Sequence, residues 1–180
     1  MKTKIITLLF LFGITTQISA QEKLITKTGH VWFYSHAALE DIEAHSRQVV
    51  AIILPDKGSI AVAIPIMSFE FKKTLMQEHF NENYMESAKY PKAKFTGSVN
   101  NLSDINLKKN GVYKTTVEGD LTIHNITKHV KAAGTVEVKD GTYAVKSKFT
   151  VEIKEYNIAV ESRFAQNIAS TIEINIDLNF

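Results

Sequence analysis

The fold is decided by one stretch, HFNENYMESAKYPKAKF, which occupies residues 79–95. Apolar side chains recur at helical spacing from Leu75 to Phe80, and this pattern predicts an amphipathic helix from residue 72 to about residue 85. Pro91 stops such a helix, because proline has no amide hydrogen to donate and its ring clashes with the preceding turn. The stretch therefore predicts the end of an amphipathic helix joined to a strand.

Outside this stretch the dominant period of the sequence is two. Residues 172–180 are the cleanest case, since Ile, Leu and Phe at the even positions alternate with Glu, Asn and Asp at the odd ones. A helix would scatter these apolar side chains around its circumference, whereas a strand places them all on one face. Residues 113–123, 130–138 and 143–153 repeat the alternation. They predict antiparallel strands with one face in contact with water.

Three N-terminal segments complete the predicted sheet: residues 29–35, 49–54 and 59–64 are apolar enough for strands. Short turn signals separate the strands, because Gly, Asn and Asp tolerate a positive φ. These signals lie at residues 55–58, 109–111 and 139–141. Strands that follow one another through such turns predict a meander.

A sheet with one apolar face buries that face by closing on itself, by stacking on a second sheet or by packing under a helix. With roughly eight strands and a single helix, closure is the arrangement we expect. The predicted fold is all-β and mainly antiparallel: a closed barrel of about eight strands with one short amphipathic helix.

The interior of an eight-stranded barrel is either filled by side chains or wide enough for one small ligand. Small residues interrupt the inward faces at Thr115, Gly119, Ala132, Gly134 and Ser147, which favours a partly empty lumen. The two glycines have a second interpretation, as bends that the closure of a barrel requires. The sequence leaves both interpretations open.

Length and the N-terminal pattern predict the domain organisation. Residues 1–20 have the form of a signal peptide, with Lys2 and Lys4 before an apolar run and Ser19-Ala20 at the exit. The apolar run is too short to span a bilayer. With 180 residues and 44% hydrophobic content, residues 21–180 suffice for one well-packed domain. We expect an exported protein, periplasmic in a bacterium with two membranes and otherwise extracellular.

Charge argues against a nucleic-acid partner. Two of the 21 Lys and Arg residues lie in the predicted signal peptide, and this leaves 19 basic against 19 acidic residues in the mature chain. A mature net charge of zero without a basic stripe is atypical of nucleic-acid binding. The chain has no cysteine, so a disulfide framework is excluded.

The sequence contains no motif typical of catalysis: it has no Gly-x-Ser-x-Gly elbow, no His-Glu-x-x-His helix and no phosphate-binding glycine loop. His30 and His36 would lie roughly 20 Å apart on one strand, too far to share a metal. His124 and His129 flank a predicted turn and could approach each other, yet a catalytic zinc usually has three protein ligands. His79 is expected to be a packed or capping residue. We predict no catalytic residue, metal ligand or cofactor.

Three segments resemble the YceI-like family of exported lipid-binding barrels. They are residues 79–95, the run Gly119-Asp120-Leu121-Thr122-Ile123-His124 with Thr127-Lys128 after it, and the run from Phe149 to Tyr156-Asn157-Ile158. The resemblance extends from about residue 29 to residue 180. It implies a lipocalin-like barrel, closed by a helix, that holds an isoprenoid or similar amphiphile in an apolar lumen.

Two positions depart from the family pattern in an informative way. Asn125 and Asn157 stand where the family usually has glycine. Asparagine is among the few other residues that adopt a left-handed backbone readily, so we expect both turns to be retained.

The predicted ligand is an isoprenoid or a quinone-like lipid, sequestered without covalent change. The helix, which the resemblance places near the barrel mouth, offers flexible and aromatic side chains for a long apolar chain. The remaining wall residues are chosen by strand face and apolar character. The candidate binding residues are Phe33, Phe71, Met76, Phe80, Tyr84, Phe95, Val117, Leu121, Val145 and Phe149.

Other interpretations remain at this stage. The aromatic residues of the helix would serve equally as core that plugs the barrel. An exported interaction or stress-response module with a filled barrel is one alternative, and an enzyme acting on a small apolar substrate is another. Trp32 and Tyr34 have the parity opposite to Val31 and Phe33, so one pair faces outward and could form an interaction surface. A homodimer is compatible with the sequence.

Overall fold

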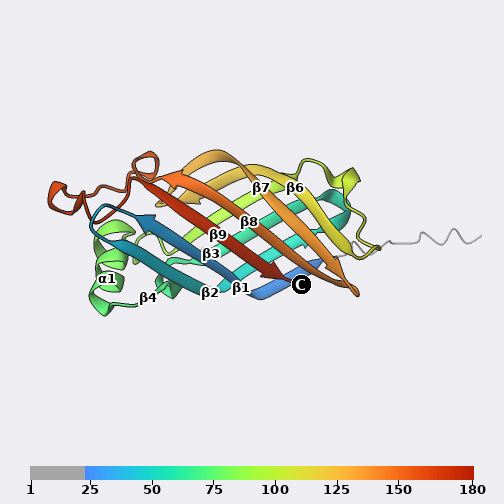
Figure 1. Ribbon diagram of the computed structural model, residues 1–180, viewed down its shortest axis with the longest axis horizontal. Coiled ribbons are helices and arrows are strands. Elements are labelled where there is room, and N and C mark those ends of the chain that lie inside the picture. Colours follow the sequence, from blue (N-terminus) through green and yellow to red (C-terminus); the bar gives the residue numbers. More distant parts are fainter. Residues whose placement is uncertain (1–22) are drawn as a thin grey trace, which may run out of the picture.

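The computed structural model describes residues 23–180 (Figure 1). The predicted signal peptide, residues 1–20, lies outside the described residues. The strands are β1 (Leu24–His36), β2 (Asp41–Leu54), β3 (Ser59–Pro65), β4 (Glu70–Phe71), β5 (Lys92–Val99), β6 (Gly111–Ile123), β7 (Ile126–Lys139), β8 (Thr142–Glu152) and β9 (Thr171–Asn179). The α-helix is α1 (Thr74–His79), and the π-helical turn η3 (Phe80–Tyr84) continues it.

The strands close into an antiparallel barrel, as predicted. Their order is β1-β9-β8-β7-β6-β5-β3-β2, and β1 also pairs with β2, which closes the ring of eight. Phe33 marks the closure, because it lies opposite Ala44 of β2 on one side and Ile174 of β9 on the other. The two-residue strand β4 is an addition beside β2.

Burial decides which face of β1 is inside. Val31 is 1% exposed, and Phe33 packs against the same core cluster. Trp32 and Tyr34 therefore point outward. The alternation in β9 is also as expected, with Ile172 and Leu178 buried in the barrel.

Gly119 lies where two strand backbones approach closely. A Cβ on Gly119 would collide with the backbone of Thr96 and Gly97 on β5. Gly134 has the same role, because its Cβ would lie 2.6 Å from the carbonyl oxygen of Lys146 on β8. Close approach of neighbouring backbones, rather than empty space, thus explains these glycines.

The left-handed turns predicted from asparagine are confirmed. Asn125 has φ 61° in the β6–β7 turn, and Asn157 has φ 54° after β8. Two of the three predicted turn signals also contain a residue with positive φ, at Gly58 and Gly141. These residues supply backbone angles that most side chains disfavour.

The third turn signal, residues 109–111, does not form a tight hairpin. It ends a longer segment, residues 100–110, between β5 and β6. Asn110 fixes this end through its side chain, which donates to Asp140 Oδ1 at 2.8 Å and accepts from the Asp140 amide at 3.0 Å. Asn110 therefore connects the segment 100–110 to the β7–β8 turn, and does not itself form a hairpin turn.

The helix is shorter and less regular than predicted. The Asn81 side-chain amide donates to the Gln77 carbonyl at 2.9 Å, the acceptor that the next helical turn would normally use. The Met85 amide bonds to the Phe80 carbonyl, five residues earlier, which is the π-helical pattern. Glu86, with φ 42°, then ends the segment before Pro91.

The loops gather at the two ends of the barrel (Figure 1). We call one the mouth end: it carries residues 37–40, the segment 66–91 with α1, the β6–β7 turn and residues 153–170. The other is the plugged end, where residues 100–110 cover the barrel. Leu102, Ile105 and Leu107 of this plug segment border its interior.

Candidate ligand cavity

The barrel lumen contains a cavity of about 440 Å³. Its lining is mostly aliphatic and aromatic and comes from all eight barrel strands, from α1 and η3, and from residues 153–168. Both the volume and the lining fall in the range of small-molecule sites. The lining includes Arg163, whose side chain is 70% exposed, so the cavity reaches the surface at the mouth end.

All ten residues predicted as binding residues line this cavity. Strand parity placed the wall residues correctly, and the helical spacing placed Met76 and Phe80. The set is Phe33, Phe71, Met76, Phe80, Tyr84, Phe95, Val117, Leu121, Val145 and Phe149.

Sequence reasoning missed two parts of the lining. One part is the inward faces of β3 and β9, for example Val62 and Ile174, which lie outside the predicted set although strand alternation applies to them. Residues 153–168 contribute Val160, Phe164 and Ile168, and no periodicity in that segment points inward. The tertiary fold, and not a local sequence pattern, brings this irregular segment to the cavity.

An aromatic cluster joins the helical segment to the barrel wall. The Phe80 ring lies 5.6 Å from Phe33, 5.6 Å from Phe69 and 5.0 Å from Phe71, measured between ring centroids. Aromatic rings in tilted and edge-on pairs at these separations stabilise the fold by more than the burial of their apolar area alone. Phe80 thus has both roles considered from the sequence: it holds the helical segment in place and forms cavity wall.

Two ion pairs lie at the mouth end. Glu40 accepts from Lys73 Nζ at 2.7 Å, and Arg163 Nε lies 2.9 Å from Glu161. Burial, aided by the Glu161 charge, raises the pKa of Tyr84, while Arg163 opposes the shift. Tyr84 therefore presents a neutral hydroxyl where the cavity meets water.

A polar contact fixes the chain after the helical segment. His124 Nε2 lies 3.0 Å from Glu86 Oε2, and its Nδ1 lies 3.1 Å from the Tyr156 carbonyl oxygen. Each ring nitrogen of His124 thus lies within hydrogen-bonding distance of an oxygen atom. The edge of the Tyr90 ring packs on the imidazole at 4.6 Å between centroids. His124 thereby connects three separate segments of the mouth end.

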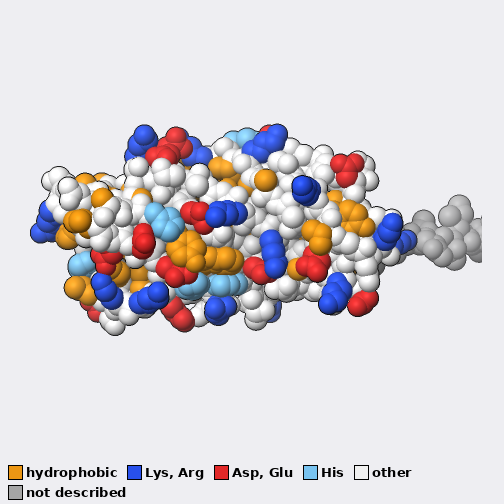
Figure 2. Space-filling model, viewed as in Figure 1, with side chains coloured by type: hydrophobic (Ala, Val, Ile, Leu, Met, Phe, Trp, Pro, Cys, Tyr) orange, Lys and Arg blue, Asp and Glu red, His pale blue; other side chains and the backbone are white. Residues whose placement is uncertain are grey.

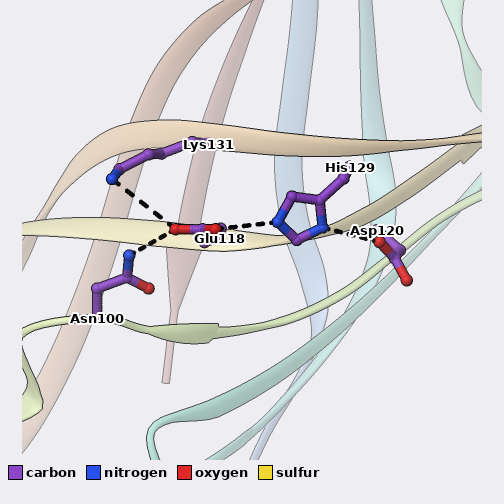
Figure 3. Close-up of polar contacts among 5 residues, drawn as sticks. All are labelled: Asn100, Glu118, Asp120, His129 and Lys131. Atoms are coloured by element: carbon purple, nitrogen blue, oxygen red, sulfur yellow. Dashed lines mark hydrogen bonds and ion pairs between the residues drawn. The ribbon is translucent and has the colours of Figure 1, made fainter.

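His129 lies on the outer face, apart from His124. Its ring bonds to Glu118 Oε1 and to Asp120 Oδ1, each at 3.0 Å (Figure 3). The hydrogen bond to Glu118, followed by that to Asp120, raises the pKa of His129. The hydrogen bonds from His129 and Asn100 lower the pKa of Glu118. The cluster is an exposed ion network on β6 and β7, remote from the lumen.

A second histidine group surrounds the outward Trp32. His30 stacks on Trp32 at 4.5 Å between centroids and lies 3.0 Å from His45, nitrogen to nitrogen. Burial, and then the nearby positive charge of Arg47, lowers the pKa of His30. In residues 23–180 no three His, Asp or Glu side chains are grouped so that they could hold a metal ion. The described helices also include none with the length and apolar character needed to cross a membrane.

Comparison with known proteins identifies the fold family. Residues 19–180 match the family model of the YceI-like domain. The BcnA structure from Burkholderia cenocepacia is similar with a TM-score of 0.70 at 19% identity, over 84% of this chain and 96% of that one. No curated protein sequence gave a significant match.

Two further solved structures share the fold. A polyisoprenoid-binding domain from Saccharophagus degradans, implicated in plant cell wall breakdown, has a TM-score of 0.75 at 14% identity, over 87% of this chain and 96% of that one. The YceI protein of Campylobacter jejuni has a TM-score of 0.54 at 16% identity, over 100% of this chain and 98% of that one.

Proposed function

We propose, from the premise that this chain belongs to the YceI-like family, that it is a non-catalytic lipid-binding protein. Its cargo would be a polyisoprenoid or a similar long apolar amphiphile, held in the barrel lumen. The polyisoprenoid-binding domain from Saccharophagus degradans, which shares the fold, supports this cargo class.

The observation that carries the proposal is the apolar cavity of about 440 Å³, which opens at the mouth end. Burial of apolar area stabilises a complex by roughly 25 cal/mol per Å². Burying a few hundred Å² of an isoprenoid would contribute on the order of 10 kcal/mol before the entropic cost of association. That free energy is sufficient for a carrier that releases its cargo.

The proposed orientation follows from the polarity of the two ends. The apolar chain lies along Val117, Val145 and Phe149, and the polar head lies at the mouth near Tyr84 and Asn167, which are lining residues there. A neutral or weakly polar head fits best, since Arg163 is already paired with Glu161. Sequestration from water, without covalent change, is the proposed mechanism.

Export is part of the proposal and rests on residues 1–20, which have the form of a signal peptide. A carrier in the periplasm or outside the cell would keep an apolar chain out of water in transit. Fractionation of cells that produce the full chain tests this placement: mature protein in the exported fraction supports it, and unprocessed protein in the cytoplasm contradicts it.

The lumen is tested by a pair of adjacent substitutions on β8. Phe149→Lys places a charge in the cavity, and Thr150→Lys places the same charge on the exposed outer face. We expect Phe149→Lys to abolish uptake of a fluorescent isoprenoid and Thr150→Lys to retain it. Circular dichroism checks that both variants fold, and normal uptake by folded Phe149→Lys contradicts the assignment.

A second pair on β7 avoids the buried charge. Ala132→Phe fills the lumen, whereas Ala133→Phe adds the same ring to the outer face. Reduced uptake in the first variant alone supports a ligand in the lumen. Equal uptake in both places the ligand elsewhere.

A further inference from the structure

The mouth end exposes large hydrophobic side chains that the core does not use. Leu39 and Met67 are each 67% exposed, and Leu75 is 61% exposed. They lie on three separate segments of the mouth end: the β1–β2 turn, the connection from β3 to β4, and α1. Figure 2 shows hydrophobic side chains exposed at the end of the molecule that carries α1.

Two of these side chains, Leu39 and Leu75, adjoin the opening of the cavity. Leu75 precedes the cavity-lining Met76 on α1 and points away from the lumen, although the apolar helical pattern of the sequence includes it. The Leu39 amide donates to the Gln166 carbonyl at 2.9 Å, so the exposed turn is held beside the segment that contributes Phe164 to the lining. The apolar cavity thus continues into an apolar rim.

We propose that this rim docks on a lipid bilayer, and this inference rests on the proposed function. Leu39 and Leu75 would enter the boundary between head groups and acyl chains, with the cavity mouth facing the membrane. Isolated apolar side chains on neighbouring loops suit shallow, reversible insertion. A lipid cargo would then pass between bilayer and lumen without exposure to water.

Charge identifies the kind of bilayer. The basic side chains closest in sequence to Leu75 and Gln166 are paired with acids: Lys73 with Glu40, Arg163 with Glu161, and Lys72 with Glu43 at 3.8 Å. Among the described residues, such pairing leaves no polybasic cluster directly beside Leu39 and Leu75 to attract anionic lipid. The proposed surface is therefore one of zwitterionic lipid, bound by apolar insertion with little dependence on salt.

Flotation of the mature protein with phosphatidylcholine vesicles tests the docking. We compare the wild type, the double variant Leu39→Gln/Leu75→Gln and the control Val112→Gln. Val112 is 65% exposed but begins β6 at the plugged end, so the control removes a similar exposed side chain far from the mouth. We expect the double variant to lose at least about tenfold in vesicle binding and the control to match the wild type.

Delivery of the isoprenoid from ethanol separates this inference from the proposed function. Wild-type protein that takes up isoprenoid from ethanol but does not float with vesicles overturns the docking and leaves the carrier proposal standing. Protein that takes up isoprenoid by neither route overturns the carrier proposal. Equal flotation of the double variant and the control, or binding that requires anionic lipid, also overturns docking through this rim.

Discussion

The mouth end and the plugged end of this barrel are closed by different kinds of contact. At the plugged end, Leu102, Ile105 and Leu107 cover the barrel and leave a void of about 50 Å³. At the mouth end, a short helical segment rests on one aromatic cluster, and polar contacts such as Glu86–His124 hold the chain after it. Apolar side chains cover one end, while the other combines the larger cavity with contacts that can exchange with water.

The two spaces share part of their walls. Ile60, Val117 and Val145 border both the main cavity and the small void. A cargo chain that enters from the mouth would therefore end at these side chains. The difference between the ends predicts a pocket with one entrance and a limit on chain length.

The largest effect is expected where the helical segment is anchored. Phe80→Ala removes the ring at the centre of the aromatic cluster and should lower the free energy of unfolding by about 2–3 kcal/mol, less than for a fully buried ring. Cargo retention should fall with it, measured as dissociation of a fluorescent isoprenoid.

Leu107→Ala is the matched truncation at the plugged end. It should lower stability by about 1–2 kcal/mol, because Leu107 is only half-buried, and retention should stay close to that of the wild type. Equal losses of retention in the two variants would remove the distinction between the ends.

A smaller effect is expected at the shared wall. Val117→Ala should join the main cavity to the void, cost about 1–2 kcal/mol of stability and shift binding toward longer prenyl alcohols. Competition between prenyl alcohols of different length measures the shift. Thr116→Ala, which truncates the outward neighbour on β6, serves as the control, and an unchanged length preference in Val117→Ala contradicts a limit set by this wall.

The His124 contact should contribute less than the aromatic cluster. His124→Gln removes an imidazole whose two ring nitrogens both have a polar partner, and we expect a loss of about 1 kcal/mol because Glu86 is partly exposed, together with faster cargo exchange. His129→Gln makes the same substitution on the outer face. Exchange rates that are equal in the two variants would show that the contact does not hold the mouth.

The smallest effect is a pH dependence of stability from the outer cluster. Because the pKa of His129 is raised in the folded state, its contribution to the free energy of unfolding is fully present below pH 6.5, the ordinary pKa. That contribution is lost as the pH rises through the folded-state pKa. Because the pKa of Glu118 is lowered in the folded state, its contribution to the free energy of unfolding is fully present above pH 4.5, the ordinary pKa. That contribution is lost as the pH falls through the folded-state pKa.

Urea unfolding of the wild type and His129→Gln across this range tests the sign. The stability difference should be greatest between pH 4.5 and 6.5 and should decline on both sides. A difference that keeps increasing as the pH rises above this window would contradict the assignment. Isoprenoid uptake should be unaffected, since the cluster lies outside the lumen.

The barrel and most of its wall could be predicted because strand alternation fixes which side chains share a face. Parity alone assigns Val117, Leu121 and Phe149 to the inner face, and all three line the cavity. The left-handed turn at Asn125 was expected because the resembling family usually has glycine there and asparagine can adopt the same backbone angles. Strand parity needs only local geometry, whereas the turn needed the resemblance as well.

The features that distinguish the two ends were harder to predict. The π-helical turn accompanies a competing bond from the Asn81 side chain to the Gln77 carbonyl, which no apolar spacing predicts. The lining by residues 153–168 and the packing of the plug segment depend on tertiary contacts between irregular loops. Hydrophobic periodicity cannot predict how such irregular segments pack.

The central claim is that the lumen holds a lipid. Native mass spectrometry of the mature protein, purified from its own compartment and followed by organic extraction, tests it most directly. We predict one isoprenoid or quinone-like molecule bound per chain. Protein that is empty and also takes up no added isoprenoid would contradict the account and direct attention to protein partners.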